Sequence, residues 1–370
     1  MSYHLTRRRF LALAAALASG GAAAEAEPFA ILALGDVHFD RLDHHDREWL
    51  RRDHPNDVHQ VENYSRITRE VTPALLAELR RTIACSDVPV QAVVQLGDLI
   101  EGLCGTPELA HRQCEEAVAF LRDADLGAPF LFTKGNHDIT GPGAREAFDR
   151  VLRPFNADQA GRVLEAASFV IERGEALFAF LDAYDPGALD WLERTLAAQS
   201  ARLVFVLLHP PVVPFGARAT WHLFAKPAQQ DQRRRLLHLL GKHRAIVLCG
   251  HLHKYGVVVR RTDCGPFLQL ALCSVLPRPD VRPKDVVEGV AHFGPDLVRL
   301  EPKFSPATEP ERRAALQAEA PFIQYYEYAD APGYARLTIR GTRVTADLQA
   351  GLGRPPWRRL NLTALRDKEP

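Results

Sequence analysis

Five short blocks of the sequence place Asp, Asn or His directly after apolar runs, at residues 35–38, 97–98, 135–138, 209–211 and 250–253. Carboxylates and imidazoles in one mixed shell suit Zn, Fe, Mn or Ni better than Ca or Mg. The blocks supply seven candidate ligands: Asp36, His38, Asp98, Asn136, His209, His251 and His253. Seven ligands exceed the need of one ion. Two transition-metal ions that share a carboxylate and lie roughly 3.5 to 4 Å apart fit the count better.

These side chains can meet only if the apolar runs before them are neighbouring strands. Buried strands are predicted at residues 29–34, 90–96, 129–133, 177–181, 203–208 and 246–249. Helical spacing of apolar residues predicts helices at 65–82, 108–121, 190–196 and 232–240, with Pro73 the one discordant residue. The alternation of strands and helices indicates an α/β fold with a largely parallel core sheet. Ligands bind such sheets outside the carboxyl ends of the strands, which is where the polar blocks stand.

The sequence after residue 275 has a different character. Residues 277–310 are rich in proline and predict a loop, and a helical stretch follows near 312–318. Alternating segments at 322–328, 334–339 and 343–348 predict an antiparallel β meander. The predicted organisation is therefore a signal segment at 1–26, a core at 27–275, a connecting loop and helix at 276–320, and a meander with a tail at 321–370.

The N-terminus has the pattern of an export signal. Arg7, Arg8 and Arg9 precede a short apolar run and then small residues up to Ala26. The order Thr-Arg-Arg-Arg-Phe-Leu resembles the twin-arginine consensus, so we expect a folded protein in the periplasm or outside the cell. The alternative is a retained amphipathic anchor. The run is too short to span a bilayer, and we expect no transmembrane segment in the mature chain.

Export to an oxidising compartment would permit disulfides. The sequence leaves two pairings open, Cys104 with Cys114 and Cys264 with Cys273.

The charge balance limits the class of partner. Lys and Arg number 46 and so do Asp and Glu, which gives a formal net charge of zero. Binding of a nucleic-acid backbone usually needs a basic excess, so no dedicated nucleic-acid binding is expected. The sequence does not indicate an oligomeric state.

The order of the blocks resembles that of calcineurin-like metallophosphoesterases. The family pattern is Asp-x-His, Gly-Asp, Gly-Asn-His-Asp or Glu, a lone His, and Gly-His-x-His, and all five blocks occur in that order between Asp36 and His253. The resemblance implies a β-sandwich of two mixed sheets flanked by helices, with the C-terminal meander in the second sheet. It also implies hydrolysis of phosphate mono- or diesters by a hydroxide that bridges two metals drawn from Fe, Zn and Mn and attacks in line.

The resemblance further implies a role for each residue. Asp36, His38 and His253 would hold one ion, Asn136, His209 and His251 the other, and Asp98 would bridge them. His137 would not be a ligand but would stabilise the transition state or protonate the leaving group. We expect Asp138 to orient His137 or a neighbouring residue.

Departures from family patterns narrow the substrate. Protein Ser/Thr phosphatases read Gly-Asp-x-Val-Asp-Arg-Gly where this chain has Glu101 and Gly102, which disfavours a phosphoprotein substrate. Purple acid phosphatases have a tyrosine ligand at the place of Glu101 and a glycine at that of His38. What remains is a small or exposed phosphate ester.

Several of these residue types also suit purely structural positions. Asp36 and Asn136 each suit a turn, and His209 suits a core position. A non-catalytic binding protein that keeps the fold without the metals is the alternative function. The His-rich residues 41–60 are expected to form a solvated loop rather than a third metal site. Arg218, Trp221 and His222 suit either a substrate wall or an exposed loop.

Overall fold

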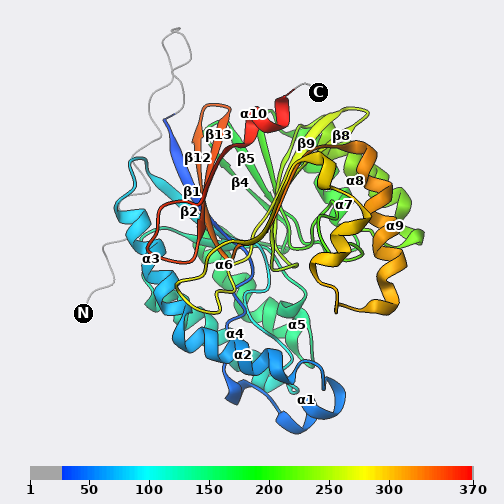
Figure 1. Cartoon of the computed structure of the whole chain (residues 1–370). Coiled ribbons are helices and arrows are strands. Elements are labelled where there is room, and N and C mark those ends of the chain that lie inside the picture. The colour runs from blue at the N-terminus through cyan, green and yellow to red at the C-terminus, as the bar shows by residue number, and fades with distance from the viewer. Residues whose placement is uncertain (1–26, 369–370) are drawn as a thin grey trace.

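The computed structural model describes residues 27–368, and its strands form two mixed sheets that lie face to face (Figure 1). The predicted signal segment, residues 1–26, lies outside the described residues. The first sheet contains β1 (Phe29–Leu34), β2 (Val90–Gln95), β3 (Phe130–Phe132), β12 (Gly333–Arg340), β13 (Arg343–Ala350) and β14 (Arg358–Asn361). Its order is β14-β13-β12-β1-β2-β3, and β1, β2 and β3 run parallel.

The second sheet also has a parallel centre. It contains β4 (Phe169–Arg173), β5 (Ala176–Phe180), β6 (Leu203–Leu207), β7 (Ile246–Cys249), β8 (Tyr255–Thr262), β9 (Gly265–Ala271), β10 (Lys284–Glu288) and β11 (Ile323–Asp330). Its order is β10-β11-β8-β9-β7-β6-β5-β4, and β5, β6 and β7 run parallel. The prediction of two mixed sheets in an α/β sandwich is confirmed.

Helices cover the outer face of each sheet (Figure 1). On the first sheet lie α2 (Val58–Glu70), α3 (Thr72–Ala84), α4 (Pro107–Asp123) and α6 (Arg153–Ala160). On the second lie α7 (Ala188–Ala198), α8 (Gln230–Lys242) and α9 (Glu309–Glu319). The remaining short helices are α1 (Arg47–Asp53), α5 (Ala144–Ala147) and α10 (Leu362–Asp367). No helix within residues 27–368 has the length and apolar character needed to cross a membrane.

The two faces of a strand enter different parts of the core. In β1, Phe29 and Ile31 pack between the sheets, whereas Leu32 and Leu34 pack under the helices. Successive side chains of a strand point to opposite faces, so a strand that is covered on both sides must be apolar throughout. This explains the unbroken apolar runs that predicted the central strands.

Three predicted elements differ from the structure. The expected helix at 65–82 is two helices, α2 and α3, which divide at Val71. Pro73 lies in the first turn of α3, where proline is tolerated because the backbone N–H groups of that turn have no acceptor within the helix. The expected loop at 277–310 contains β10 and short 3₁₀ turns. The meander is also divided, because β11 pairs with β8 in the second sheet while β12 pairs with β1 and β13 in the first.

Neither disulfide that the sequence left open is formed. All six cysteines are free, and Cys104, Cys114 and Cys273 are buried.

Candidate metal centre

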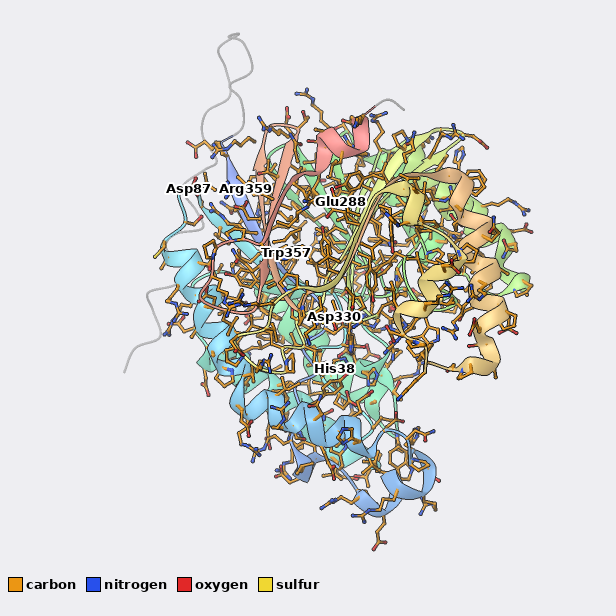
Figure 2. The ribbon with its side chains drawn as sticks, viewed as in Figure 1. His38, Asp87, Glu288, Asp330, Trp357 and Arg359 are labelled. Carbon is orange, nitrogen blue, oxygen red and sulfur yellow. The ribbon has the colours of Figure 1, made fainter. Side chains whose placement is uncertain are left out.

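The candidate ligands follow five parallel strands that end at the same edge of the sandwich. Asp36 and His38 come after β1, Asp98 after β2, and Asn136 after β3 in the first sheet. From the second sheet come His209 after β6 and the pair His251 and His253 after β7. His38 lies at the end of the strands beside the lower helices, and Asp87, just before β2, lies toward the opposite end (Figure 2). The two sheets therefore contribute to one site.

Four of these residues form a first cluster. Asp36, His38, Asp98 and His253 each offer one ligand atom, and these atoms lie within 4.8 Å of one another. The Nε2 atoms of His38 and His253 are 3.0 Å apart, and Oδ1 of Asp36 is 3.5 Å from Nε2 of His253. Two imidazole nitrogens and a carboxylate that converge on one point are a donor set that fits a transition-metal ion.

A second cluster shares Asp98 with the first. It consists of Asp98, His209 and His251. Nε2 of His209 lies 3.0 Å from Oδ2 of Asp98, 3.0 Å from Nδ1 of His251 and 3.1 Å from Oδ1 of Asn136. The same Oδ2 atom is 3.8 Å from Nε2 of His38 in the first cluster. One carboxylate oxygen thus lies between two groups of ligands.

Unusual backbone conformations position these side chains. His38, Asp98, His251 and His253 all have positive φ angles, of 48°, 54°, 73° and 54°. Residues other than glycine rarely adopt this left-handed conformation, and such strain persists mainly at functional sites. Gly97 is also left-handed, with φ of 87°, and a Cβ atom there would lie only 2.5 Å from Nδ1 of His209. A glycine is therefore required for the chain to pass this close to the imidazole ring.

A further set of contacts fixes the orientation of the imidazole rings. Nδ1 of His38 lies 2.7 Å from Oε2 of Glu101, and Nδ1 of His209 lies 2.8 Å from the carbonyl oxygen of Leu96. Nδ1 of His253 is 3.3 Å from the hydroxyl of Tyr64. When Nδ1 is bound in this way, Nε2 is left with its lone pair toward the cluster, which is the arrangement that holds a ligating histidine in metal sites.

His137 lies beside the first cluster, where it forms a further group of potential ligands with His38 and Glu101. Its Nδ1 atom is 2.7 Å from the carbonyl oxygen of Glu101, and its backbone N–H donates to Oδ1 of Asp98 at 2.8 Å. Burial lowers the pKa of the ring, but the carboxylates of Glu101 and Asp98 outweigh burial and raise the pKa to about 9. The ring is 19% exposed, so it can reach a bound molecule.

Of the two partners expected for Asp138, His137 or a neighbouring residue, the structure shows a neighbour, since the backbone N–H of Asp98 donates to Oδ2 of Asp138 at 3.2 Å. Asp138 also accepts backbone N–H groups from Gly135 at 2.7 Å, Leu99 at 2.8 Å and Ile100 at 3.1 Å. It therefore braces the turn after β2 against the turn after β3, and it acts on Asp98 through the backbone. The partner of His137 is Glu101.

The charges of the site attract cations. Burial would raise the pKa of Asp98, but the imidazoles of His209 and His137 outweigh it and the pKa lies well below its usual value. Burial likewise lowers the pKa of His209, which Asp98 nonetheless raises to about 9. Without metal, protons on His137 and His209 balance the charge of the buried carboxylates. Metal ions would take the place of those protons, because ligands must bind in their deprotonated forms.

Comparison with known proteins agrees with this geometry. A model of the family described as calcineurin-like phosphoesterase matches residues 29–255, more than half of the 370 residues. The chain belongs to the calcineurin-like phosphoesterase family. No curated protein sequence matches the chain.

Solved structures share the fold at low sequence identity. PhoD is 13% identical with a TM-score of 0.51, over 91% of this chain and 69% of that one. A dimetal phosphatase from Danio rerio is 12% identical with a TM-score of 0.51, over 90% of this chain and 98% of that one. GAP50, the anchor in the inner membrane complex of Plasmodium, is also 12% identical with a TM-score of 0.51, over 91% of this chain and 89% of that one.

All seven sequence-predicted ligands of this calcineurin-like phosphoesterase are brought together, and the structure adds residues whose roles the motifs do not show. Glu101 stands out in the sequence only as a departure from family patterns, yet it contacts both His38 and His137. Tyr64 stacks on the ring of His38 with 4.3 Å between ring centroids, and the hydroxyl of Tyr184 is 3.5 Å from Oδ1 of Asn136. No local signal identifies the two tyrosines, which come from α2 and from the turn after β5.

Of the three residues that suit a substrate wall or an exposed loop, two pack together beside the site and the third makes a different contact. Trp221 lies beside the site, with its ring centroid 5.4 Å from that of His251, and Arg218 lies over the indole. His222 instead points to the carbonyl oxygen of Ala219 at 2.7 Å. Burial, with Arg233 nearby, lowers the pKa of His222 to about 4.

The His-rich residues 41–60 are not a solvated loop. They contain a 3₁₀ turn, α1 and the start of α2, and both His44 and His45 are buried. His45 lies 2.7 Å from Oδ1 of Asp40, and His44 lies 3.0 Å from Oε2 of Glu116. No group of potential ligands found within residues 27–368 includes them.

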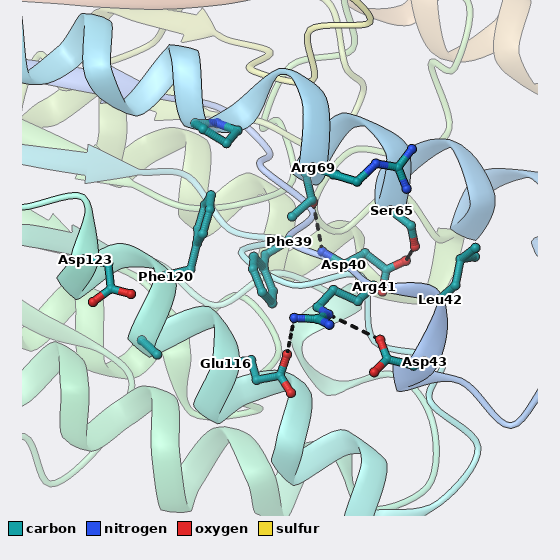
Figure 3. Close-up of a pocket in the computed structure, with 13 residues that line it drawn as sticks. Phe39, Asp40, Arg41, Leu42, Asp43, Ser65, Arg69, Glu116, Phe120 and Asp123 are labelled. Atoms are coloured by element: carbon teal, nitrogen blue, oxygen red, sulfur yellow. Dashed lines mark hydrogen bonds and ion pairs between the residues drawn. The ribbon is translucent and has the colours of Figure 1, made fainter.

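The same segment borders a cavity of about 760 Å³ between α2 and α4 (Figure 3). At its wall Ser65 donates to Asp40 at 2.5 Å, and Arg41 pairs with Asp43 and Glu116 at 3.2 and 3.3 Å. Each of these charged side chains at the cavity wall therefore has a polar or oppositely charged partner.

Proposed function

We propose that this calcineurin-like phosphoesterase is a dinuclear metal-dependent hydrolase of phosphate mono- or diesters. The observation that carries the proposal is the position of Asp98, whose Oδ2 atom faces ligands of both clusters. Asp36, His38 and His253 would hold one transition-metal ion and Asn136, His209 and His251 the other, with Fe, Zn and Mn as the expected metals. Bound there, two cations supply Lewis-acid polarisation of the phosphoryl oxygens and make water a usable nucleophile near neutral pH.

The burial of the residues suits this chemistry. Asp36, His38, Asp98 and His209 are buried, whereas Asn136, His137, His251 and His253 are partly exposed. The buried group keeps bulk water from the inner carboxylates and strengthens electrostatic interactions within the site. The partly exposed group leaves one side of the site open for an ester to approach.

His137 is the proton donor in this proposal. Its Nδ1 atom is held by the carbonyl oxygen of Glu101, so Nε2 is the atom that remains for a substrate. Negative charge builds on the leaving oxygen as its bond to phosphorus breaks, and a proton from Nε2 would neutralise it. The substrate class that we propose is a small or exposed phosphate ester, and we also propose that residues 1–26 direct export of the folded protein.

Replacement of Asp98 tests the proposal. Asp98→Asn removes the shared charge while retaining its size, and we expect loss of at least one bound metal and of turnover on both an aryl phosphate and a bis-aryl phosphate. The matched control is Asp347→Asn on β13, where the carboxylate pairs with exposed Arg359. Metal content is measured by elemental analysis, and folding by thermal unfolding.

The outcomes separate the two classes of function. Two metals per wild-type chain, with turnover lost only in the Asp98 variant, support the hydrolase. Full turnover in the Asp98 variant or in metal-free protein contradicts it. Metal-free wild-type protein without turnover on any phosphate ester supports the non-catalytic alternative.

A further inference from the structure

An exposed tryptophan stands beside one of the two ligand clusters. Trp221 is 42% exposed, and its ring centroid lies 5.4 Å from that of His251 at an angle of 39°. An indole offers a large flat apolar face on which another ring can stack. The nearby His251 is a candidate ligand of the second cluster, so the indole is within reach of whatever binds there.

Two neighbouring side chains hold the indole in place. The ring of Phe304 meets it edge-on at 5.3 Å and 78°, and the guanidinium group of Arg218 lies 5.4 Å from its centroid. Arg218 is in turn held by Glu301, whose Oε2 atom accepts from Nε at 3.0 Å. A ring fixed in this way loses little conformational freedom when a second ring stacks on it, which favours affinity.

The backbone of the segment is fixed as well. The N–H of Trp221 donates to the carbonyl oxygen of Arg218 at 3.0 Å, and that of Leu223 donates to the carbonyl oxygen of Pro211 at 2.8 Å. The turn that carries Trp221 is thereby tied to the chain that immediately follows His209. Its position relative to the second cluster is set by the fold rather than by the side chain alone.

We propose that Trp221 is a specificity-determining residue that stacks on a planar aromatic ring of the substrate, such as a nucleobase or an aryl group joined to the phosphate. The inference rests on the proposed function, because it places the phosphate at the two clusters and the ring on the indole. Stacking on an aromatic side chain is tolerant of ring type, since every base or aryl group has a π face.

Equilibrium binding tests the platform without turnover. Metal-loaded protein is titrated calorimetrically with the non-hydrolysable phosphonate analogues of adenosine 5′-monophosphate and of ribose 5-phosphate, which differ only in the base. We expect the wild type to bind the nucleotide analogue about tenfold more tightly, a value toward the low end for base stacking on an aromatic side chain. In Trp221→Ala this ratio falls toward one, and in Trp221→Phe most of it remains.

Phe322→Ala is the matched control. Phe322 is 39% exposed and lies under the guanidinium of Arg260 at 4.6 Å, as Trp221 lies under Arg218. Phe322 lies just before the first residue of β11, whereas Asp330 is the last residue of that strand. Asp330 pairs with Lys254, which is next to His253 in the chain, so the Asp330 end of β11 is the end near the site. At 3.3 Å per strand residue, Phe322 stands roughly 25 Å from the site. Its replacement leaves the ratio unchanged.

The results decide between a platform and a structural role. An unchanged ratio in Trp221→Ala, or equal weakening of both analogues, overturns the proposal. Benzylphosphonate in a parallel titration shows whether the preferred ring is attached directly or through a sugar. If the protein prefers the nucleotide analogue but hydrolyses no ester, the stacking role of Trp221 is supported and the proposed hydrolase function is contradicted. The failure of one proposal can therefore be told from the failure of the other.

Discussion

Replacement of Glu101 by Gln tests how the first cluster is oriented. Oε2 of Glu101 lies 2.7 Å from Nδ1 of His38, and Oε1 accepts from the side-chain amide of Gln60 at 2.8 Å. The carboxylate is fully buried, and it holds the proton of His38 on Nδ1, so that Nε2 faces Asp98 and His253. Gln keeps the size of the side chain but removes its charge. Only one of its two terminal atoms can accept a hydrogen bond, whereas both oxygens of Glu101 do so.

The expected magnitude follows from the position of this contact. Loss of a hydrogen-bond partner behind a ligating histidine typically costs 10- to 100-fold in metal affinity or activity. For Glu101→Gln we therefore expect metal affinity at the first cluster to fall by about 10- to 100-fold, or about 1.4 to 2.7 kcal/mol. A glutamine at position 101 has only one acceptor oxygen, for which His38 and Gln60 would compete. We therefore expect a loss in the upper part of this range.

The assay is a metal titration of apo-protein followed by calorimetry and by turnover of an aryl phosphate. Glu116→Gln is the control, since Glu116 forms a similar contact with His44, which belongs to neither cluster. Metal affinity that is equal in wild type and in Glu101→Gln, or that falls equally in Glu116→Gln, would refute the reasoning.

Two further predictions concern His137 and the buried ion pair on α9. His137→Asn should retain both metals but lose about 10²- to 10⁴-fold in rate on alkyl esters and far less on nitrophenyl esters, whose leaving group needs no proton; equal loss on both contradicts a donor role. Burial alone would raise the pKa of Glu319, but Arg233 and Arg260, at 2.5 and 2.6 Å, lower it. Its stabilisation is thus present above the unfolded pKa of about 4.3 and is lost as pH falls through the lower folded value. Glu319→Gln should lower the free energy of unfolding at pH 7 by about 3 to 5 kcal/mol and weaken its acid dependence, as measured by denaturant titration from pH 3 to 7; an unchanged pH dependence contradicts this.

The sequence was sufficient to predict that the candidate ligands converge, because their signals are local. Each stands within four residues of the end of an apolar strand, and parallel strands bring their carboxyl ends to one edge. Asp36 and His251 lie 215 positions apart, yet the N–H of His251 donates to Oδ1 of Asp36 at 2.9 Å. The order of the strands in the two sheets creates this contact. The sequence motifs mark the residues that make it.

Other features depend on long-range partners that composition does not reveal. His44 and His45 lie in a polar stretch that predicts solvent exposure, but Glu116 and Asp40 satisfy them in the interior. The alternating pattern of residues 322–348 predicts strands correctly and gives no information on which sheet each one joins. The chain crosses between the sheets at Pro332 and Gly333, where a Cβ at Gly333 would lie 2.0 Å from the carbonyl oxygen of Gln349.

The position of Asp98 between two ions is tested most directly by a crystal structure of the metal-loaded protein, with anomalous scattering recorded at the absorption edge of the metal. We expect two peaks roughly 3.5 to 4 Å apart, both within bonding distance of the Asp98 carboxylate. A single peak, or a second peak that Asp98 does not contact, would contradict the account.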